Sequence, residues 1–233
     1  MRGFFITGTD TGVGKTLVSV GLLRNFAAAG LRAVGMKPVA SGALQTTAGL
    51  RNADALALQA ASTASQPYDD VNPYVFVSAI APHLAAAEAG VTIEPSRILA
   101  ALQRLCSGAD VVVVEGVGGW QVPLADGLQL PDLARSLGLP VILVVGLRLG
   151  CLNHAQLSAR AIREDGLILA GWVANAIDPD FECRSGNLAT LKQAIHAPLL
   201  GDVAWQPAIA SEGLADCLDT VSIMKLLNDG HSE

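Results

Sequence analysis

Short apolar runs alternate with longer amphipathic stretches along most of the chain. Several of the short runs are apolar at every position, which is typical of parallel strands covered on both faces of a sheet. We therefore expect a largely buried, largely parallel set of strands. The runs that predict strands are Arg2–Thr7, Arg32–Lys37, Val111–Glu115, Val141–Val145, Leu167–Ala174 and Leu199–Ala204.

The stretches between these runs have the spacing of helices. In the first of them Val20, Leu23 and Ala27 fall on one face, and Gly30 provides a C-terminal stop. Because strands and helices alternate, the pattern predicts an α/β fold: a doubly wound, mostly parallel sheet with helices on both faces. The predicted helices are Thr16–Ala29, Ala53–Ala61, Pro95–Cys106, Leu152–Glu164 and Arg184–Ala194.

We expect residues 1–233 to form a single domain with a sizeable core. The segment Ser62–Gly90 departs from the alternation, because two X-Pro steps in it mark turns beside a short helix. We interpret this segment as an excursion over the ends of the strands and not as a second domain.

Composition narrows the class of partner. Apolar residues make up 51% of the chain and charged residues 15%, the formal net charge is −6, and there is no basic run. This balance argues against nucleic acid or an anionic membrane as the main partner. The longest apolar runs are too short to span a bilayer, and a strand pattern begins at once with no leader before it, so we expect a cytoplasmic protein. The four cysteines form no CxxC pair, which leaves a zinc site unsupported.

The segment GTDTGVGKT, residues 8–16, lies between the first predicted strand and the first predicted helix. It ends in the Gly-Lys-Thr of a P-loop, although Thr9 stands where the strict pattern has its first glycine. Such glycines let successive backbone N–H groups face one anion. Lys15 would reach the β- and γ-phosphates, and the Thr16 hydroxyl would bind magnesium. The pattern favours a P-loop NTPase-like nucleotide site over an ordinary turn, but motors, switches, partitioning ATPases, kinases and ligases share it.

Three charged residues could complete this site. Glu115 ends a buried strand and is placed to face the metal, and the following Gly116–Gly118 lets backbone approach a ligand. Lys37 ends the second strand, where a lysine is usually solvated, yet beside a triphosphate it could neutralise a phosphoryl group. Asp54 is equally a first-turn helix acid favoured by the helix dipole. Spacing alone leaves Lys37 and Asp54 open.

Two further segments follow predicted strands. Asn175-Ala176-Ile177-Asp178 lacks the lysine of the N-K-x-D guanine motif, so GTP is discounted, while the Asn175 amide could still bind a purine edge. Gly150 to Asn153 open a helix whose free N–H groups could bind an anion such as a substrate carboxylate. A plain helix start is about as consistent with that spacing.

Longer segments in a fixed order add to the P-loop. They include GTDTGVGKT (8–16), KPVASG (37–42), LRNADALALQ (50–59), VNPYVF (71–76), VEGVGGWQVPL (114–124) and LGCLNHA (149–155). Together they cover most of the chain and resemble the dethiobiotin synthetase family. KPVASG with VEGVGGW and LGCLNHA is far more specific than the P-loop alone.

The resemblance implies a reaction. The family closes the ureido ring of dethiobiotin from 7,8-diaminononanoate and carbon dioxide, with ATP as co-substrate and Mg²⁺ as cofactor. It proceeds through a carbamate and a carbamic-phosphoric anhydride, and its members are homodimers.

The resemblance also implies roles for individual residues. Lys37 and Lys15 correspond to the catalytic lysines, and Thr16, Asp54 and Glu115 to the magnesium set. Thr11 and Ser41 correspond to substrate contacts at the diamine end, whereas Gly150, Cys151, Leu152 and Asn153 correspond to a site for the tail carboxylate supplied by the second subunit. The remaining nucleotide contacts would be Gly12, Val13, Gly14, Leu17, Gly116, Val117, Gly118, Asn175, Ala176, Ala204, Trp205, Gln206 and Glu212.

The main alternative is a partitioning-type P-loop ATPase that acts through protein partners. Such proteins carry an extra lysine early in the loop, where this chain has Asp10, and many end in a basic amphipathic helix. In this chain Lys225 is the single basic residue (Lys or Arg) of 219–233. A synthetase of the cobyrinate type would also need a glutaminase domain, for which 233 residues leave little room.

Overall fold

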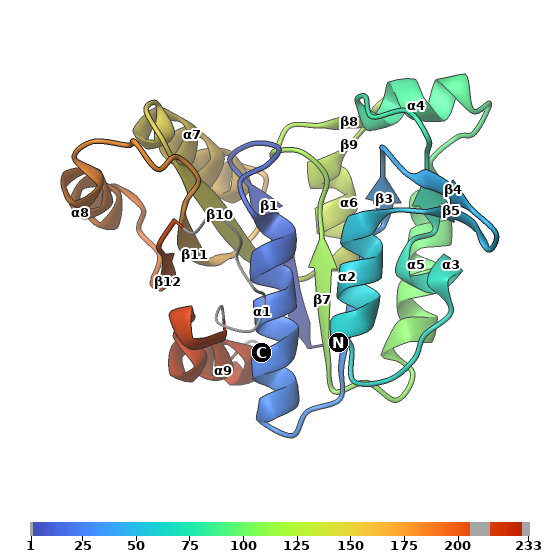
Figure 1. Cartoon of the computed structure of the whole chain (residues 1–233), viewed down its shortest axis with the longest axis horizontal. Coiled ribbons are helices and arrows are strands. Elements are labelled where there is room, and N and C mark those ends of the chain that lie inside the picture. Colours follow the sequence, from blue (N-terminus) through green and yellow to red (C-terminus); the bar gives the residue numbers. More distant parts are fainter. Residues whose placement is uncertain (1, 206–214, 230–233) are drawn as a thin grey trace.

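The fold is built on a six-stranded sheet in which every neighbouring pair of strands is parallel (Figure 1). This holds within residues 2–205 and 215–229, the part of the chain that the computed structural model describes. The strand order is β12-β11-β10-β1-β7-β2. Strands β2 and β7 therefore lie on one side of β1, and the later strands β10, β11 and β12 lie on the other side. The strands are β1 (Gly3–Gly8), β2 (Ala33–Met36), β7 (Val111–Glu115), β10 (Val141–Leu147), β11 (Leu169–Ala176) and β12 (Leu199–Val203).

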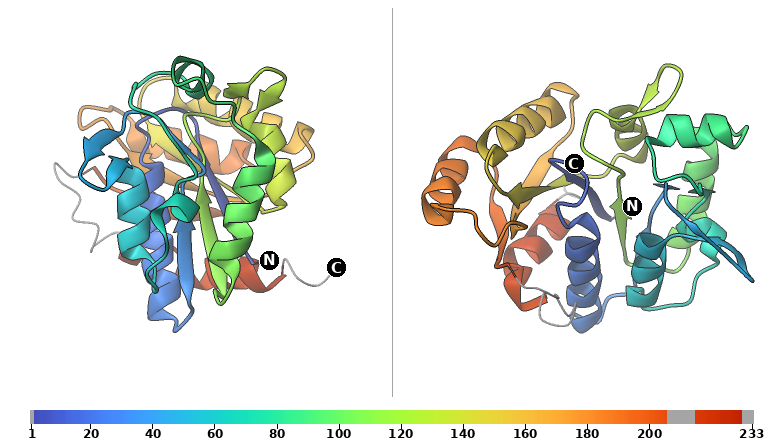
Figure 2. Two further views of the ribbon diagram at one scale, coloured as in Figure 1. Left: turned by 90° about the vertical axis from the view of Figure 1, so that its right-hand side faces the viewer. Right: turned by 45° about the horizontal axis from the view of Figure 1, so that its top comes forward.

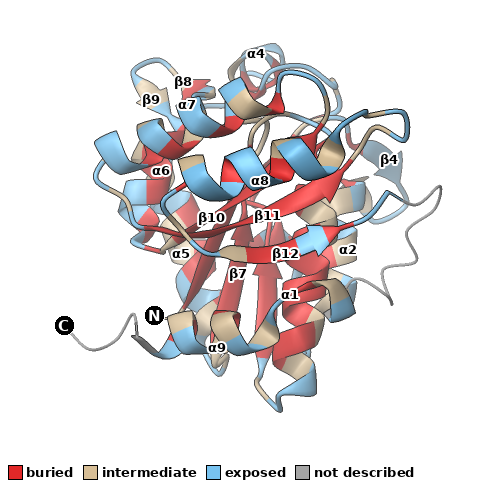
Figure 3. Cartoon of the chain, turned by 90° about the vertical axis from the view of Figure 1, so that its left-hand side faces the viewer, coloured by how far each residue is buried: buried red, intermediate tan, exposed pale blue. Residues whose placement is uncertain are grey.

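Helices cover both faces of this sheet, and the strands between them are buried (Figure 3). The predicted doubly wound fold is therefore confirmed, and α2, α5 and α8 have the predicted bounds. The longer helices are α1 (Lys15–Ala28), α2 (Ala53–Ala61), α5 (Pro95–Cys106), α6 (Leu130–Leu137), α7 (Cys151–Glu164), α8 (Arg184–Ala194) and α9 (Thr220–Asp229).

Alternate side chains of each strand supply two separate hydrophobic cores. In β7, Val111 and Val113 belong to the core under α1 and α9, whereas Val112 and Val114 belong to the core under α5 and α6. This follows from the two-residue period of a strand. It explains why the run is valine at all four positions: neither face of the strand meets water.

Shorter elements decorate the carboxyl ends of the strands. Figures 1 and 2 place α4 and the β8–β9 hairpin at the same end of the molecule as the turn between β1 and α1. The sequence pattern missed the short strands, because two or three residues are too few to show a period. They are β3 (Val39–Ala40), β4 (Leu44–Thr46), β5 (Gly49–Arg51), β6 (Tyr74–Val75), β8 (Pro123–Ala125) and β9 (Leu128–Gln129), with the short helices α3 (Tyr68–Val71), α4 (Pro82–Glu88) and the 3₁₀ turn η1 (Ala215–Cys217).

The excursion predicted at 62–90 contains α3, β6 and α4. Strand β6 pairs in parallel with β3, which directly follows the end of β2. The segment is thereby tied to the main sheet at the point where Lys37 leaves β2.

Helix α2 begins where a side chain replaces its missing hydrogen bonds. The Oδ1 of Asn52 accepts from the backbone N–H of Asp54 at 3.0 Å and of Ala55 at 3.2 Å. Such an N-cap contributes roughly 1 kcal/mol. It also fixes the first turn of α2, which carries the Asp54 side chain.

Within the described ranges, no helix combines the length and the apolar character that crossing a membrane requires.

Close packing of α2 on β2 gives a first prediction. A Cβ at Gly35 would lie 2.9 Å from the Leu58 Cβ and 3.2 Å from the Leu58 carbonyl oxygen. Gly35→Ala should therefore lower the free energy of unfolding by roughly 1–3 kcal/mol, measured by urea denaturation.

The matched control is Gly186→Ala in α8, where an added Cβ would meet no described atom within 4 Å. It should raise stability by roughly 0.5–1 kcal/mol through helix propensity. Equal effects of the two substitutions would contradict the packing argument.

Candidate active site

The glycine-rich turn after β1 adopts backbone conformations that favour glycine. Gly12 (φ 76°) and Gly14 (φ 92°) both lie in the left-handed region. A Cβ at Gly14 would also lie 2.2 Å from Nδ2 of Asn175. Helix α1 begins at Lys15, directly after Gly14. Its first backbone N–H groups have no partners within the helix, so the turn offers them to an anion.

Lys15 lies across this turn and is buried. Its Nζ donates to the backbone oxygen of Asp10 at 2.9 Å and to that of Gly118 at 2.6 Å. Burial, and after it the nearby positive charge of Lys37, lower the pKa of Lys15, while nearby carboxylates raise it. Together these effects bring the pKa of Lys15 down to about 8. A bound anion would raise this pKa, because it stabilises the charged form.

Glu115, the last residue of β7, is the carboxylate around which the site is assembled. It is 1% exposed. Its Oε1 accepts from the Thr16 hydroxyl at 2.8 Å and from Nζ of Lys37 at 2.6 Å. Its Oε2 is buried and has no hydrogen-bond partner among the described residues. A buried oxygen of this kind marks a place where a further positive group would be stabilised.

A lysine at the end of a strand is usually solvated, but Lys37 is buried. Its side chain is 3% exposed, and its Nζ also contacts Oδ2 of Asp54 at 3.1 Å and the carbonyl of Gly116 at 3.2 Å. Burial by itself lowers the pKa of Lys37, but the Glu115 and Asp54 carboxylates outweigh it and raise the pKa overall. Lys37 is therefore a fully charged ammonium at neutral pH.

Asp54 lies at the open side of this cluster, with 44% of its side chain exposed. Burial, the largest single effect, raises the pKa of Asp54, but Lys37, a hydrogen bond with Thr16 and the charge of Lys15 together lower it overall. The position left open by the sequence is thus resolved: Asp54 faces Lys37 and Thr16 and not bulk solvent alone.

Thr16, Asp54 and Glu115 together offer oxygen atoms of the kind that Mg²⁺ takes. No group of three or more His, Cys, Asp or Glu side chains in 2–205 and 215–229 is placed to hold a metal ion. Mg²⁺ is usually bound by one or two carboxylates together with substrate phosphates, and Asp54 and Glu115 are two carboxylates on the same cleft. The unpartnered Oε2 of Glu115 fits the same group.

These residues line one cleft of about 770 Å³ at the carboxyl ends of β1, β2 and β7. Ser41 also lines the cleft, and its hydroxyl is buried without a hydrogen-bond partner among the described residues. Val13 lies behind the turn, and Gly116 contributes its carbonyl to Lys37. The predicted site residues that line the cleft are Thr11, Gly12, Gly14, Lys15, Thr16, Leu17, Lys37, Ser41, Asp54, Glu115, Val117 and Gly118.

The described residues among those expected to bind adenine do not line this cleft. Asn175 is buried at the end of β11, and its Nδ2 donates to the carbonyl of Val13 at 2.8 Å, so it supports the P-loop turn from the side. Ala176 is buried beside it, whereas Ala204 and Trp205 are exposed after β12. The predicted contacts Gln206 and Glu212 lie outside the described residues.

The four residues expected to bind a carboxylate also lie outside the cleft. Gly150 (φ 95°) precedes α7 with no side-chain cap, Cys151 is buried, Leu152 is partly buried and Asn153 is exposed. A single chain therefore does not bring this helix start to Lys37.

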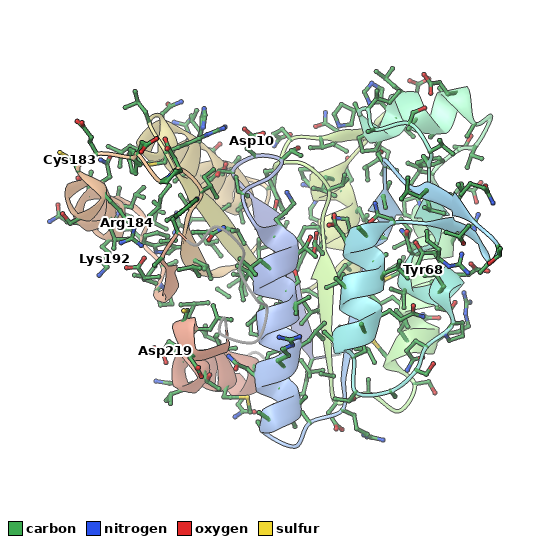
Figure 4. The ribbon with its side chains drawn as sticks, in the orientation of Figure 1. Asp10, Tyr68, Cys183, Arg184, Lys192 and Asp219 are labelled. Atoms are coloured by element: carbon green, nitrogen blue, oxygen red, sulfur yellow. The ribbon has the colours of Figure 1, made fainter. Side chains whose placement is uncertain are left out.

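Sequence reasoning missed an ion pair at the mouth of the turn. Asp10, labelled in Figure 4, contacts Arg148 through Oδ2 and Nη2 at 2.5 Å. Arg148 follows β10 directly, so the rule that located Glu115 and Lys37, a polar residue at the carboxyl end of a parallel strand, would have found it. It links two of the loops that border the nucleotide turn.

Solved structures share this fold, and one of them is a nucleotide complex. The septum site-determining protein MinD from Pyrococcus horikoshii, complexed with Mg-ADP, has a TM-score of 0.57 at 16% identity and covers 99% of this chain and 96% of its own. A MinC:MinD complex from Aquifex aeolicus has a TM-score of 0.57 at 13% identity, covering 100% and 97%. At such identities the likeness concerns the fold.

The fold and the glycine-rich turn together define an α/β protein of the P-loop class. A family model described as an AAA domain matches residues 2–213. ATP-dependent dethiobiotin synthetase BioD of Xanthomonas campestris pv. campestris (strain 8004) is 53% identical over 91% of this chain and 95% of its own length. The corresponding protein of Pseudomonas paraeruginosa is 54% identical over 92% and 93%. The chain belongs to the ATP-dependent dethiobiotin synthetase family.

This membership decides between the two interpretations of the P-loop. The partitioning-type ATPase shares the fold with this chain, but the MinD structures are 13% and 16% identical to it. The synthetases are more than 50% identical over nearly the whole chain.

The lowered pKa of Lys15 predicts a proton linkage. Near pH 8 about half of the free protein has a neutral Lys15, so ATP binding should take up about half a proton at that pH. Affinity should accordingly fall as the pH rises from 7 to 9. Calorimetry in buffers of different ionisation enthalpy measures the uptake. Lys15→Arg, which stays charged, should remove it; uptake of equal size in that variant would contradict the assignment.

The buried Lys37–Glu115 pair predicts a large loss of stability when one partner is removed. Lys37→Met keeps the volume but leaves the Glu115 carboxylate buried with its ammonium partner gone, and should cost about 3–5 kcal/mol. The double variant Lys37→Met/Glu115→Gln should recover most of that loss, as measured by urea unfolding. A loss below about 1 kcal/mol in the single variant would mean that the pair is not desolvated.

Proposed function

We propose that this chain is a carbon–nitrogen ligase that converts 7,8-diaminononanoate, carbon dioxide and ATP into dethiobiotin, ADP and phosphate in biotin biosynthesis. The observation that carries the proposal is the Lys37 ammonium, held between Glu115 and Asp54 beside the P-loop, in a chain of the dethiobiotin synthetase family. This positive charge, beside that of Lys15 in one cleft, supports a role for Lys37 in phosphoryl transfer.

The chemistry explains why ATP is consumed. One amine of the substrate adds to carbon dioxide and gives a carbamate, whose carbon is a poor electrophile because its negative charge is delocalised. A carbamate oxygen then takes the γ-phosphoryl group, which releases ADP and forms a carbamic-phosphoric anhydride. The second amine attacks the anhydride carbon, the ring closes, and phosphate leaves.

The two lysines supply what this transfer needs. A loose phosphoryl-transfer transition state requires positioning and neutralisation of charge more than acid–base catalysis. Lys15 provides charge from the P-loop, and Lys37 provides it from the end of β2. Because the pKa of Lys37 is raised, its charge persists throughout the neutral pH range.

We assign magnesium binding to Thr16, Asp54 and Glu115. Their oxygen atoms suit the ion, and the bound ion would neutralise charge on the nucleotide phosphates. Thr16 and Glu115 are already joined at 2.8 Å, so little rearrangement of this chain is needed to present them together.

Thr11 and Ser41 line the cleft and are assigned to the diamine end of the substrate. We assign the tail carboxylate to the start of α7, residues 150–153, of the second subunit of a homodimer. The free N–H groups of that helix start suit an anion, and its place outside this chain's own cleft is what a contribution from a partner requires. We assign binding of the nucleotide base to Asn175, Ala176, Ala204, Trp205, Gln206 and Glu212. We also expect the enzyme to be located in the cytoplasm.

The assay that tests the function measures ADP release with 7,8-diaminononanoate and bicarbonate, and with either omitted. Turnover should require both, whereas turnover indifferent to the diamine would favour an ATPase that acts through protein partners. Lys37→Met should lower kcat roughly 100- to 1000-fold and leave the affinity for Mg-ATP within a few-fold. A large loss of ATP affinity with little change in kcat would refute the role of Lys37.

A further inference from the structure

A chain of buried hydrogen bonds runs behind the active site through Asn52, Tyr68 and Asn72. The backbone N–H of Asn52 donates to the Tyr68 hydroxyl at 2.7 Å, and that hydroxyl donates to Oδ1 of Asn72 at 3.0 Å. All three residues are buried. Figure 4 labels Tyr68, which opens α3 on the side of the molecule that carries α2.

One end of the chain holds the backbone of Lys37. The Asn72 side-chain amide donates to the Lys37 carbonyl at 2.6 Å and to the Tyr74 carbonyl at 3.0 Å. The backbone N–H of Lys37 donates to the carbonyl of Val71 at 2.7 Å. Both polar groups of Lys37's backbone are thus fixed by the residues that end α3, at the point from which its side chain enters the site.

The other end of the chain holds two further parts of the cleft. Nδ2 of Asn52 donates to the carbonyl of Ser41 at 3.2 Å, and Oδ1 of Asn52 caps the helix turn that carries Asp54. Three residues of the cleft are therefore joined by one path of hydrogen bonds: Lys37, Ser41 and Asp54.

The central hydroxyl cannot be removed without leaving unpaired groups. The Tyr68 hydroxyl accepts one hydrogen bond and donates one, so its loss strands a buried N–H of Asn52 and a buried oxygen of Asn72. Unpaired buried polar groups are costly and relax by moving. The movement would reach the Lys37 carbonyl through the same Asn72 amide.

We propose that Tyr68, acting through Asn72 and Asn52, is a positioning residue for phosphoryl transfer, which keeps Lys37 in register with Asp54 and Ser41. The inference rests on the proposed function, and it assigns to a residue outside the cleft a share of the geometry that the reaction requires. Misplacement of a reacting group by about 1 Å can cost up to roughly 100-fold in rate.

Tyr68→Phe removes the hydroxyl and retains the ring, over which the Arg51 guanidinium lies at 4.1 Å. The matched control is Asp70→Asn on the same short helix. It breaks the ion pair between Asp70 and Arg104 of α5 at 2.7 Å but leaves the hydrogen-bond chain untouched. Both substitutions should destabilise the protein and lower the midpoint of urea unfolding. They differ because only Tyr68→Phe breaks the hydrogen bonds that lead to Lys37.

Two readouts decide the proposal. Tyr68→Phe should lower kcat roughly 10- to 100-fold with the KM for ATP within about three-fold, and Asp70→Asn should leave both nearly unchanged. The side-chain ¹⁵Nζ signal of Lys37, assigned by its loss in Lys37→Met, should shift in Tyr68→Phe and stay in place in Asp70→Asn.

Equal losses of kcat in both variants, or an unchanged kcat and Lys37 signal in Tyr68→Phe, would overturn the positioning role. A wild-type protein with no diamine-dependent turnover would instead refute the proposed function, and the Lys37 signal would still decide whether Tyr68 controls the lysine.

Discussion

The structure of the site depends on one buried ion pair, between the Lys37 ammonium and the Glu115 carboxylate at 2.6 Å. Either charge would be costly to bury alone, and each offsets the cost of burying the other. The pair is possible because β2 and β7 are neighbouring parallel strands, with Met36 beside Val114, so the residues that follow in register emerge together. An antiparallel neighbour would have sent Lys37 to the opposite edge of the sheet.

The same geometry brings the P-loop into the cluster. Strand β7 lies between β1 and β2, so its terminal carboxylate can reach the first turn of α1 on one side and Lys37 on the other. One oxygen of Glu115 receives both Thr16 and Lys37, and the second oxygen remains for a further positive group. Parallel topology, burial and charge thus converge on a single carboxylate, and the fold holds these charges together without any long loop.

Much of this could be predicted from the sequence, for identifiable physical reasons. The predicted helices 53–61 and 95–106 match α2 and α5, whose starts are set by local features, the Asn52 cap and Pro95. What the sequence left open was non-local: whether Lys37 points inward depends on Glu115, 78 positions away along the chain. The path through Tyr68 was missed for the same reason, because its hydrogen bonds from Asn52 to Tyr68 and from Asn72 to Lys37 join residues 16 and 35 positions apart. The Asp10–Arg148 pair differs: its partners are 138 positions apart, but the place of Arg148 at the end of a parallel strand could have pointed to it.

The contact between Gly14 and Asn175 has a consequence for how such chains can diverge. A side chain at position 14 would strike the Asn175 amide, which in turn holds the carbonyl of Val13. Substitution at either position affects the other. A side chain at position 14 would need a smaller residue at position 175, and a smaller residue there would no longer hold the Val13 carbonyl. Two positions more than 160 residues apart are thereby coupled through one amide group, so their substitutions should not act independently on the shape of the loop.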